Sequence, residues 1–176
     1  MLPVNECNVP LCWVEKNVSR PHAWVKLWKH HGAQEQADKI NDLLQKRGEI
    51  DNIQFGGKIS SELLLPKILQ IVEEDPYIYD EAAGFLEAAD WLTQILTGSQ
   101  KRSGNLAGYK AMWTPETGYP SKDFLIELSP KLENLVDEKL GSDITLAAQP
   151  VGYLTERWAK ELGLCKGIPV ATAIID

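Results

Sequence analysis

The chain has 176 residues, 44% of them hydrophobic, and its 18 basic and 25 acidic side chains give a net charge of −7. This length suffices for one domain with its own core, and the ordinary composition excludes collagen, coiled coils and wholesale disorder. The negative charge argues against nucleic acid or an anionic membrane as a partner, because both require a basic protein surface. Three scattered cysteines form no disulfide framework, so we expect reduced thiols and a cytoplasmic protein.

The first quarter of the sequence predicts short extended segments and then one helix. Residues 1–13 predict a hairpin that turns at residues 5–8, and its two prolines favour a sheet edge. Roughly alternate apolar residues over 22–28 predict a short strand. From residue 33 to 46 the apolar spacing becomes helical, and Gly48 is expected to end that helix.

A second helix is expected to begin near Ser60 or Ser61, whose hydroxyls suit the position before a helix. Pro66 lies too deep for the first helical position, which predicts a kink or a late start. The dipeptide at 75–76, Asp-Pro, should end this helix, since the residue before a proline avoids the helical conformation.

The middle of the chain predicts a short extended run at 85–86 and a helix from Asp90, as its cap, to Thr97. Residues 99–110 are polar and contain glycine, which indicates a loop. Two shorter helices follow, at 121–128 and 130–139.

The last part of the sequence predicts one helix and one strand. Thr155 should cap a helix that ends at Gly163. Residues 168–175 are continuously apolar, which is typical of a strand buried on both faces. Strands alternating with helices and a buried final strand indicate a single α/β domain.

No short motif in the sequence identifies a functional site by itself. Gly56-Gly57-Lys58 lacks the earlier glycine and the following Ser or Thr of a P-loop, so a tight turn is the better interpretation. His22, His30 and His31 with the cysteines match no zinc spacing. By themselves, Lys110 would be a surface lysine and Trp28 a core residue. Asp176 would be either a cap or a ligand-binding carboxylate at the end of a strand.

Four segments together carry a resemblance that none carries alone. They are Trp-Val-Lys-Leu-Trp-Lys-His-His at 24–31, Phe-Gly-Gly-Lys-Ile-Ser-Ser-Glu at 55–62, Phe-Leu-Glu-Ala-Ala-Asp-Trp at 85–91 and Ala-Gly-Tyr-Lys-Ala-Met-Trp at 107–113. In this order they resemble the FGGY carbohydrate kinases, and among them the bacterial L-ribulokinases. The resemblance runs over essentially all 176 residues.

The resemblance implies a ribonuclease-H-like α/β fold of the actin and hexokinase type. Enzymes of this family close two such domains around a sugar and ATP. Residues 1–176 resemble an incomplete first, sugar-binding domain that begins after the phosphate-binding loop, with the nucleotide domain absent. We therefore expect a fragment of an ATP-dependent kinase for the 5-hydroxyl of ribulose in L-arabinose catabolism, inactive alone, with ATP and Mg bound only in the intact enzyme.

Three residues receive roles from the resemblance. Asp176 matches the family's catalytic aspartate, which is the general base for the sugar hydroxyl. Lys110 matches a lysine that contacts the sugar, and Trp28 matches an aromatic residue that lines the sugar pocket. His30 departs from the pattern, because many ribulokinases carry Asp there. No residue is assigned to the binding of ATP or magnesium, apart from the indirect role of Asp176.

Two alternatives stay open. The fragment could come from a kinase for another pentulose or a pentitol, or it could be a non-catalytic binding or assembly module derived from such a kinase. We expect a ribulose-type sugar, and neither nucleic acid nor a membrane, as the partner. A homo-oligomer also remains open, because an incomplete lobe would expose strand edges and apolar surface.

Overall fold

The computed structural model describes residues 1–49 and 57–175 of the chain. Its helices are α1 (Gln34–Arg47), α2 (Leu64–Glu74), α3 (Pro76–Glu81), α4 (Ala88–Thr97), α5 (Gly104–Ala111), α6 (Lys122–Leu128) and α7 (Glu156–Leu162). Shorter helical turns lie at Leu11–Trp13, Glu15–Asn17, Pro21–Ala23, Pro130–Leu132 and Val136–Leu140. Within these described ranges, no helix is long and apolar enough to span a membrane.

The strands pair two by two. Antiparallel β1 (Leu2–Val4) and β2 (Gly84–Leu86) align Leu2 with Leu86. Parallel β3 (Arg102–Ser103) and β4 (Ile144–Thr145) align Arg102 with Ile144. Antiparallel β5 (Pro150–Tyr153) and β6 (Pro169–Ala171) align Gly152 with Val170. The described strands therefore form three small sheets, and the expected mixture of helices and strands is confirmed.

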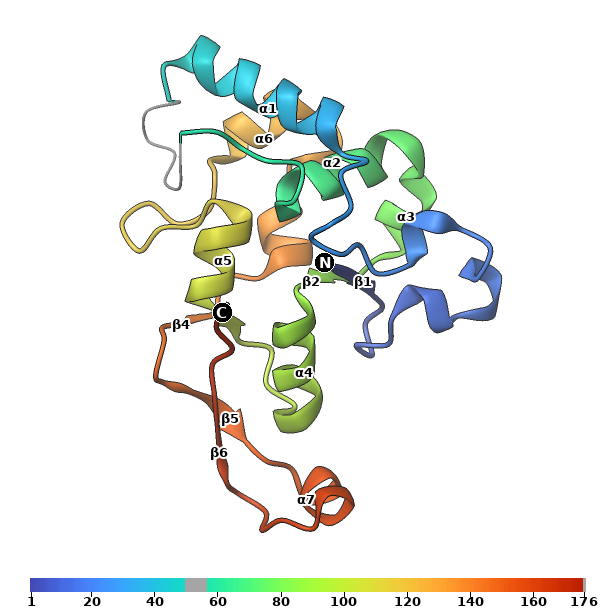
Figure 1. Cartoon of the computed structure of the whole chain (residues 1–176), viewed down its shortest axis with the longest axis vertical. Helices are drawn as coiled ribbons and strands as arrows, with labels where there is room; N and C mark the ends of the chain where they lie inside the picture. The colour runs from blue at the N-terminus through green and yellow to red at the C-terminus, as the bar shows by residue number, and fades with distance from the viewer. Residues whose placement is uncertain (50–56, 176) are drawn as a thin grey trace.

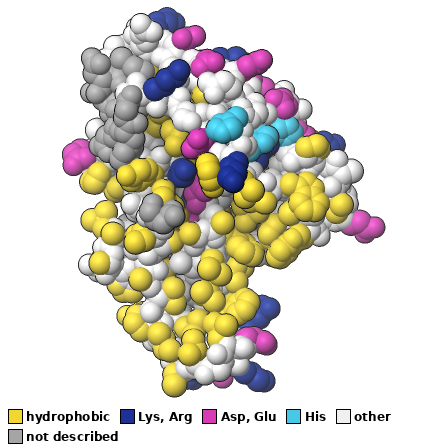
Figure 2. All heavy atoms as spheres, viewed as in Figure 1, with side chains coloured by type: hydrophobic (Ala, Val, Ile, Leu, Met, Phe, Trp, Pro, Cys, Tyr) yellow, Lys and Arg dark blue, Asp and Glu magenta, His cyan; other side chains and the backbone are white. Residues whose placement is uncertain are grey.

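The molecule divides into a helical body and an arm (Figure 1). α1 lies above α2 and α6 in the body, while β5, β6 and α7 extend from its lower end. The arm is hydrophobic over much of its visible surface, whereas basic, acidic and histidine side chains gather over the body (Figure 2). Exposed apolar side chains on the arm and its connections include Leu146, Tyr153, Leu162 and Ile174.

The main core lies among α1, α2, α3 and α6. α2 is buried from Leu64 to Val72, because neighbours cover it on nearly all sides. Ile40 of α1, Phe124 of α6 and Phe85 of β2 pack into the same cluster. Burying each such side chain contributes about 1.5–3 kcal/mol, so these contacts dominate the stability of the body.

The N-terminal expectations are partly correct. The turn at 5–8 is confirmed, with the Asn8 amide donating to the Asn5 carbonyl over 2.9 Å. The hairpin is reduced to one bridge between Val4 and Pro10, because β1 pairs with β2 instead. The strand expected over 22–28 is wrong: Pro21 starts a short helical turn, and the following residues form a loop.

The predicted α1 is confirmed, and Gly48 ends it in the left-handed conformation at φ 69°. The late start of α2 is also confirmed, because it begins at Leu64 rather than at the serines. Pro66 is then its third residue, in the first turn, where a missing amide costs no intrahelical bond. Asp75 ends α2 as expected, and its carboxylate accepts from the Ile78 amide at the start of α3.

Two expectations for the middle of the chain are wrong. α4 begins at Ala88, so Asp90 lies inside the helix and is buried rather than capping it. The expected loop at 99–110 contains β3 and α5, and the Ser103 hydroxyl caps α5 by accepting from the Leu106 amide. Lys110 therefore lies on a helix and not in a loop.

The C-terminal helices α6 and α7 are confirmed, including Ser121 and Thr155 at their starts. The helix expected at 130–139 is two short turns. The strand buried on both faces at 168–175 is wrong: only Pro169–Ala171 pairs, and only with β5. Ile168 is 39% exposed and Ile174 is 64% exposed, because no second layer of the described chain covers this strand.

Candidate functional site

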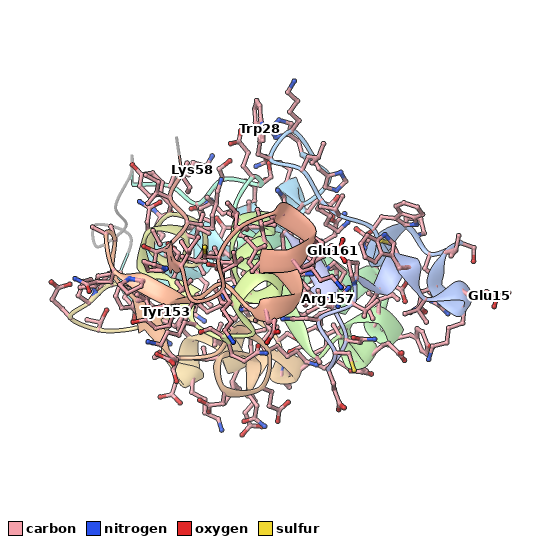
Figure 3. The ribbon with its side chains drawn as sticks, turned by 90° about the horizontal axis from the view of Figure 1, so that it is seen from below. Glu15, Trp28, Lys58, Tyr153, Arg157 and Glu161 are labelled. Atoms are coloured by element: carbon pink, nitrogen blue, oxygen red, sulfur yellow. The ribbon has the colours of Figure 1, made fainter. Side chains whose placement is uncertain are left out.

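Trp28 lies in the loop between Pro21–Ala23 and α1, and its side chain is exposed. Its relative exposure is 58%, so the interpretation of Trp28 as a core residue is wrong. Its side chain projects from the edge of the molecule in Figure 3. The Lys29 ammonium lies 5.2 Å from the centre of the ring, as in a cation–π pair. The ring therefore offers a flat apolar face to a ligand.

Lys67 of α2 holds the backbone beside Trp28. The Lys67 ammonium donates to the carbonyl oxygens of Leu27 and Glu62, each over 2.9 Å. Only 2% of Lys67 is exposed, and this burial lowers its pKa, while Glu87 opposes the shift and Lys110 adds to it. A buried ammonium requires such acceptors, so Lys67 fixes the Trp28 loop and the segment before α2 to one helix.

Lys110 lies in the last turn of α5 and is half-buried. It forms no hydrogen bond or ion pair with the residues that the structure describes. Burial is the main reason why the pKa values of Lys67 and of the Met1 amine are lowered. The positive charge of Lys110 lowers both further. Lys67 thus relates the two predicted sugar contacts, since it bonds beside Trp28 and lies within electrostatic reach of Lys110.

Asp176 lies outside the described residues, but the backbone before it is held firmly. The Ser103 hydroxyl donates to the Ala173 carbonyl over 2.6 Å, and the Ile175 amide donates to Asn105 Oδ1 over 2.8 Å. Asn105 lies in the first turn of α5 and Lys110 in its last turn, about 8 Å further along the helix axis. The carboxyl end of the described chain therefore lies against the helix that carries Lys110 (Figure 1).

An ion pair that the sequence does not reveal supports this helix. Arg102 Nε lies 3.0 Å from Asp90 Oδ2, and the second Asp90 oxygen accepts from the Ser103 amide over 2.9 Å. The remaining guanidinium donors bond to the carbonyl oxygens of Leu140 and Phe85. Burial raises the pKa of Asp90, and Arg102 offsets part of that rise. Nothing in the spacing of residues 90 and 102 signals this pair.

His22 precedes the Trp28 loop, and His30 and His31 lie within it, two and three residues after Trp28. His22 Nε2 lies 3.0 Å from Glu74, and His31 Nδ1 lies 3.2 Å from the Ser61 hydroxyl. His30, at the position that departs from the family pattern, is half-buried, and its Nε2 has no partner among the described residues. Across residues 1–49 and 57–175, no three His, Cys, Asp or Glu side chains converge on a metal site. The three cysteines are free.

A cavity of about 680 Å³ lies on another side of α5, between it, α6 and the segment before α2. Gly108 and Tyr109 contribute to its wall, but Trp28 and Lys110 do not. Its lining is largely apolar and includes Leu44, Ile59, Met112, Tyr119 and Phe124. This cavity is therefore separate from the predicted sugar contacts. Gly56, part of the rejected P-loop pattern, lies outside the described residues.

No family model matches the chain. It is 51% identical to the ribulokinase of Bacillus licheniformis over 176 residues, which is all of this chain and 32% of that protein. The ribulokinases of Geobacillus thermodenitrificans and Mycolicibacterium smegmatis are 46% and 43% identical over the same 176 residues, each covered to 31%. The chain thus spans about a third of the length of the curated relatives it matches.

Solved structures of low identity share the fold. A xylulose kinase from Brucella ovis matches with a TM-score of 0.66 and 17% identity, over 84% of this chain and 28% of that one. A gluconate kinase from Lactobacillus acidophilus matches with a TM-score of 0.56 and 15% identity, over 84% and 28%. At these identities the likeness concerns the fold alone. The described chain therefore has the architecture of part of a sugar kinase.

Proposed function

Since this chain is homologous to ribulokinases throughout its length and shares the fold of sugar kinases, we propose that it forms part of an ATP-dependent L-ribulokinase. Its place in that enzyme is the first, sugar-binding domain. The observation that carries the proposal is 43–51% identity to ribulokinases with no residue of the chain left unmatched. The enzyme would act in the cytoplasm, in the catabolism of L-arabinose.

The proposed reaction is transfer of the γ-phosphoryl group of ATP to the 5-hydroxyl of ribulose. Asp176 accepts the proton of that hydroxyl as its oxygen attacks the γ-phosphorus. The bond between this phosphorus and the bridging oxygen breaks, and ADP leaves. Since the protein does little covalent chemistry in phosphoryl transfer, the main requirement is a fixed position for the sugar.

Lys110 and Trp28 supply that position in our proposal. Lys110 is half-buried and donates no hydrogen bond within the described residues, so its three N–H donors are free for sugar oxygens. The exposed ring of Trp28 suits the apolar C–H face of a sugar. Lys67 supports the arrangement because it holds the carbonyl of Leu27, next to that ring.

ATP and its magnesium ion are not assigned to this chain. In the described residues, no cluster of His, Cys, Asp or Glu side chains has the composition of a metal site. Because the chain spans about a third of the length of the ribulokinases it matches, we assign nucleotide and magnesium binding to the rest of the enzyme, and we expect no turnover from the 176-residue chain alone. Catalysis of ADP formation by this chain with L-ribulose would contradict that assignment.

The experiment is a substrate panel on a full-length kinase that carries this segment. ADP release is measured with ATP and, separately, L-ribulose, D-xylulose and ribitol. We expect the highest kcat/KM for L-ribulose, with the phosphate on carbon 5 of the product by NMR. A tenfold higher kcat/KM for another pentulose or a pentitol would overturn L-ribulose as the proposed substrate. If no ADP is released with any of these sugars, the non-catalytic module is favoured.

A further inference from the structure

Two side chains at the start of α5 hold the backbone at residues 173–175, about 70 positions later in the chain. The Ser103 hydroxyl donates to the Ala173 carbonyl over 2.6 Å. Asn105 Oδ1 accepts from the Ile175 amide over 2.8 Å. Within the described residues, these are the hydrogen bonds found for 173–175, which follow the last pairing of β6.

Ser103 is itself fixed from several sides. Its residue is 1% exposed, and its hydroxyl oxygen also accepts from the Leu106 amide, which caps α5. Its backbone amide donates to the buried Asp90 carboxylate, which is paired with Arg102. The Ser103 oxygen accepts from the Leu106 amide on its helix side, so the hydroxyl proton points away from the helix and is donated to the Ala173 carbonyl. This junction is therefore rigid rather than an incidental surface contact.

We infer that Ser103 and Asn105 are positioning residues that fix the backbone leading to Asp176 against the helix that carries Lys110. The inference rests on the proposed function, since it gives the junction a catalytic consequence. One helix then positions both the Lys110 ammonium and the backbone at residues 173–175 that precedes Asp176. A displacement of about 1 Å in such an arrangement can cost about 100-fold in rate, so these bonds should control turnover.

The test compares four variants of a full-length kinase that carries this segment. Asn105→Leu removes the acceptor for the Ile175 amide, whereas Asn105→Asp keeps an acceptor oxygen at the same distance along the side chain. Ser103→Ala removes the donor to Ala173, whereas Ser103→Thr keeps a hydroxyl. Ser121→Ala is the matched control, because Ser121 also caps a helix, by accepting from the Phe124 amide, but has no contact with 173–175.

The readouts are kcat, KM for L-ribulose and amide hydrogen exchange at Ile175. We expect Asn105→Leu to lower kcat about 10- to 100-fold while KM changes less than threefold. Asn105→Asp and Ser103→Thr should recover at least a third of the parent kcat. Ser121→Ala should stay within twofold of the parent, which separates loss of a helix cap from loss of positioning.

The exchange measurement uses the 176-residue chain and does not depend on activity. Exchange at Ile175 should become at least tenfold faster in Asn105→Leu and stay slow in Asn105→Asp. Unchanged exchange would overturn the junction itself. An active parent whose four variants all keep kcat within twofold would overturn the positioning role alone. A parent that leaves ribulose unphosphorylated while exchange behaves as expected would overturn the proposed function, and the catalytic meaning of the junction with it.

Discussion

Arg102 and Asp90 form an ion pair of 3.0 Å between side chains that are only 6% and 2% exposed. Both oxygens of Asp90 and three nitrogens of Arg102 are bonded, to each other or to backbone groups. The pair joins α4, β2, the turn that ends at Leu140, and β3. A buried charge left without its partner is costly, so this pair supports the fold only while it is complete.

Replacing one member of the pair should therefore destabilise the chain strongly. We expect Asp90→Leu to lower the free energy of unfolding by about 3–5 kcal/mol, because it leaves the guanidinium of Arg102 buried and unpaired. Urea denaturation followed by circular dichroism measures this change. The double variant Asp90→Leu with Arg102→Met should be less destabilised than Asp90→Leu alone. If the free energy of unfolding falls in the double variant by the sum of the losses in Asp90→Leu and Arg102→Met, the two side chains are not coupled.

Lys67 offers a second stability test. Lys67→Met keeps the volume of the side chain but leaves the carbonyl oxygens of Leu27 and Glu62 without their donor. Hydrogen bonds that involve a charged group contribute about 1.5–3 kcal/mol each. Removing the buried charge also removes its desolvation cost, which offsets part of the loss, so we expect the free energy of unfolding to fall by about 2–3 kcal/mol. Chemical denaturation measures it. Lys39→Met, which removes an exposed ion pair with Glu73, is the control and should cost less than about 1 kcal/mol. Equal losses would contradict the special role of Lys67.

The sequence predicts those helices whose apolar spacing and end residues agree with their packing in the fold. α1 has a helical apolar stripe and a glycine at its end, and α6 has a serine at its start, so both could be predicted. α5 could not, because two of its eight residues are glycines, which weaken a helix in isolation. Packing favours Gly104: an added Cβ there would lie 3.2 Å from Ile144 Cγ2, so the Ile144 side chain would have to shift by a few tenths of an ångström to keep α5 this close to β4.

The candidate site was accessible from the sequence only through the resemblance. An isolated lysine at 110 or tryptophan at 28 has no local signal, since its role depends on neighbours remote in the chain. The sequence does not reveal the supporting residues for the same reason. The bonded partners of Lys67, Ser103 and Asn105 lie 5 to 70 positions away. The apolar run at 168–175 misled because hydrophobicity alone cannot tell a strand covered by its own chain from one left exposed.

His22 and His30 should make the chain less stable in mild acid. Burial lowers the pKa of both imidazoles, with Lys26 adding to the shift and Glu74 opposing it. The unfolded chain then binds more protons than the folded chain below pH 6.5, so stability rises as the pH increases through this range. Urea denaturation at pH 5 and 7 should show the rise. In the double variant His22→Gln with His30→Gln it should be smaller, and an unchanged pH dependence would contradict this origin.

Trp28 should matter for sugar binding and little for stability. Its ring is 58% exposed, so Trp28→Ala is expected to change the free energy of unfolding by less than about 1 kcal/mol. In a full-length kinase that carries this segment, KM for L-ribulose should rise about tenfold, while Trp28→Phe keeps an aromatic face and most of the affinity. Trp13→Ala, at a residue that is 67% exposed, is the control. A similar rise in KM for both alanine variants would argue against a specific role for Trp28.

Lys110 provides the sharpest separation between a structural and a binding role. Its ammonium has no partner among the described residues, and its charge is unfavourable for the buried Lys67 nearby. Lys110→Met should therefore leave the unfolding free energy unchanged or slightly higher, yet raise KM for L-ribulose at least tenfold in a full-length kinase. Lys110→Arg should not restore binding, since a planar guanidinium cannot replace a compact ammonium among sugar hydroxyls. Lys122→Met, at an exposed position of α6, is the control and should change neither quantity by much. If Lys110→Met unfolds more easily while KM stays constant, Lys110 is a structural residue and the assignment of the sugar site to this end of α5 fails.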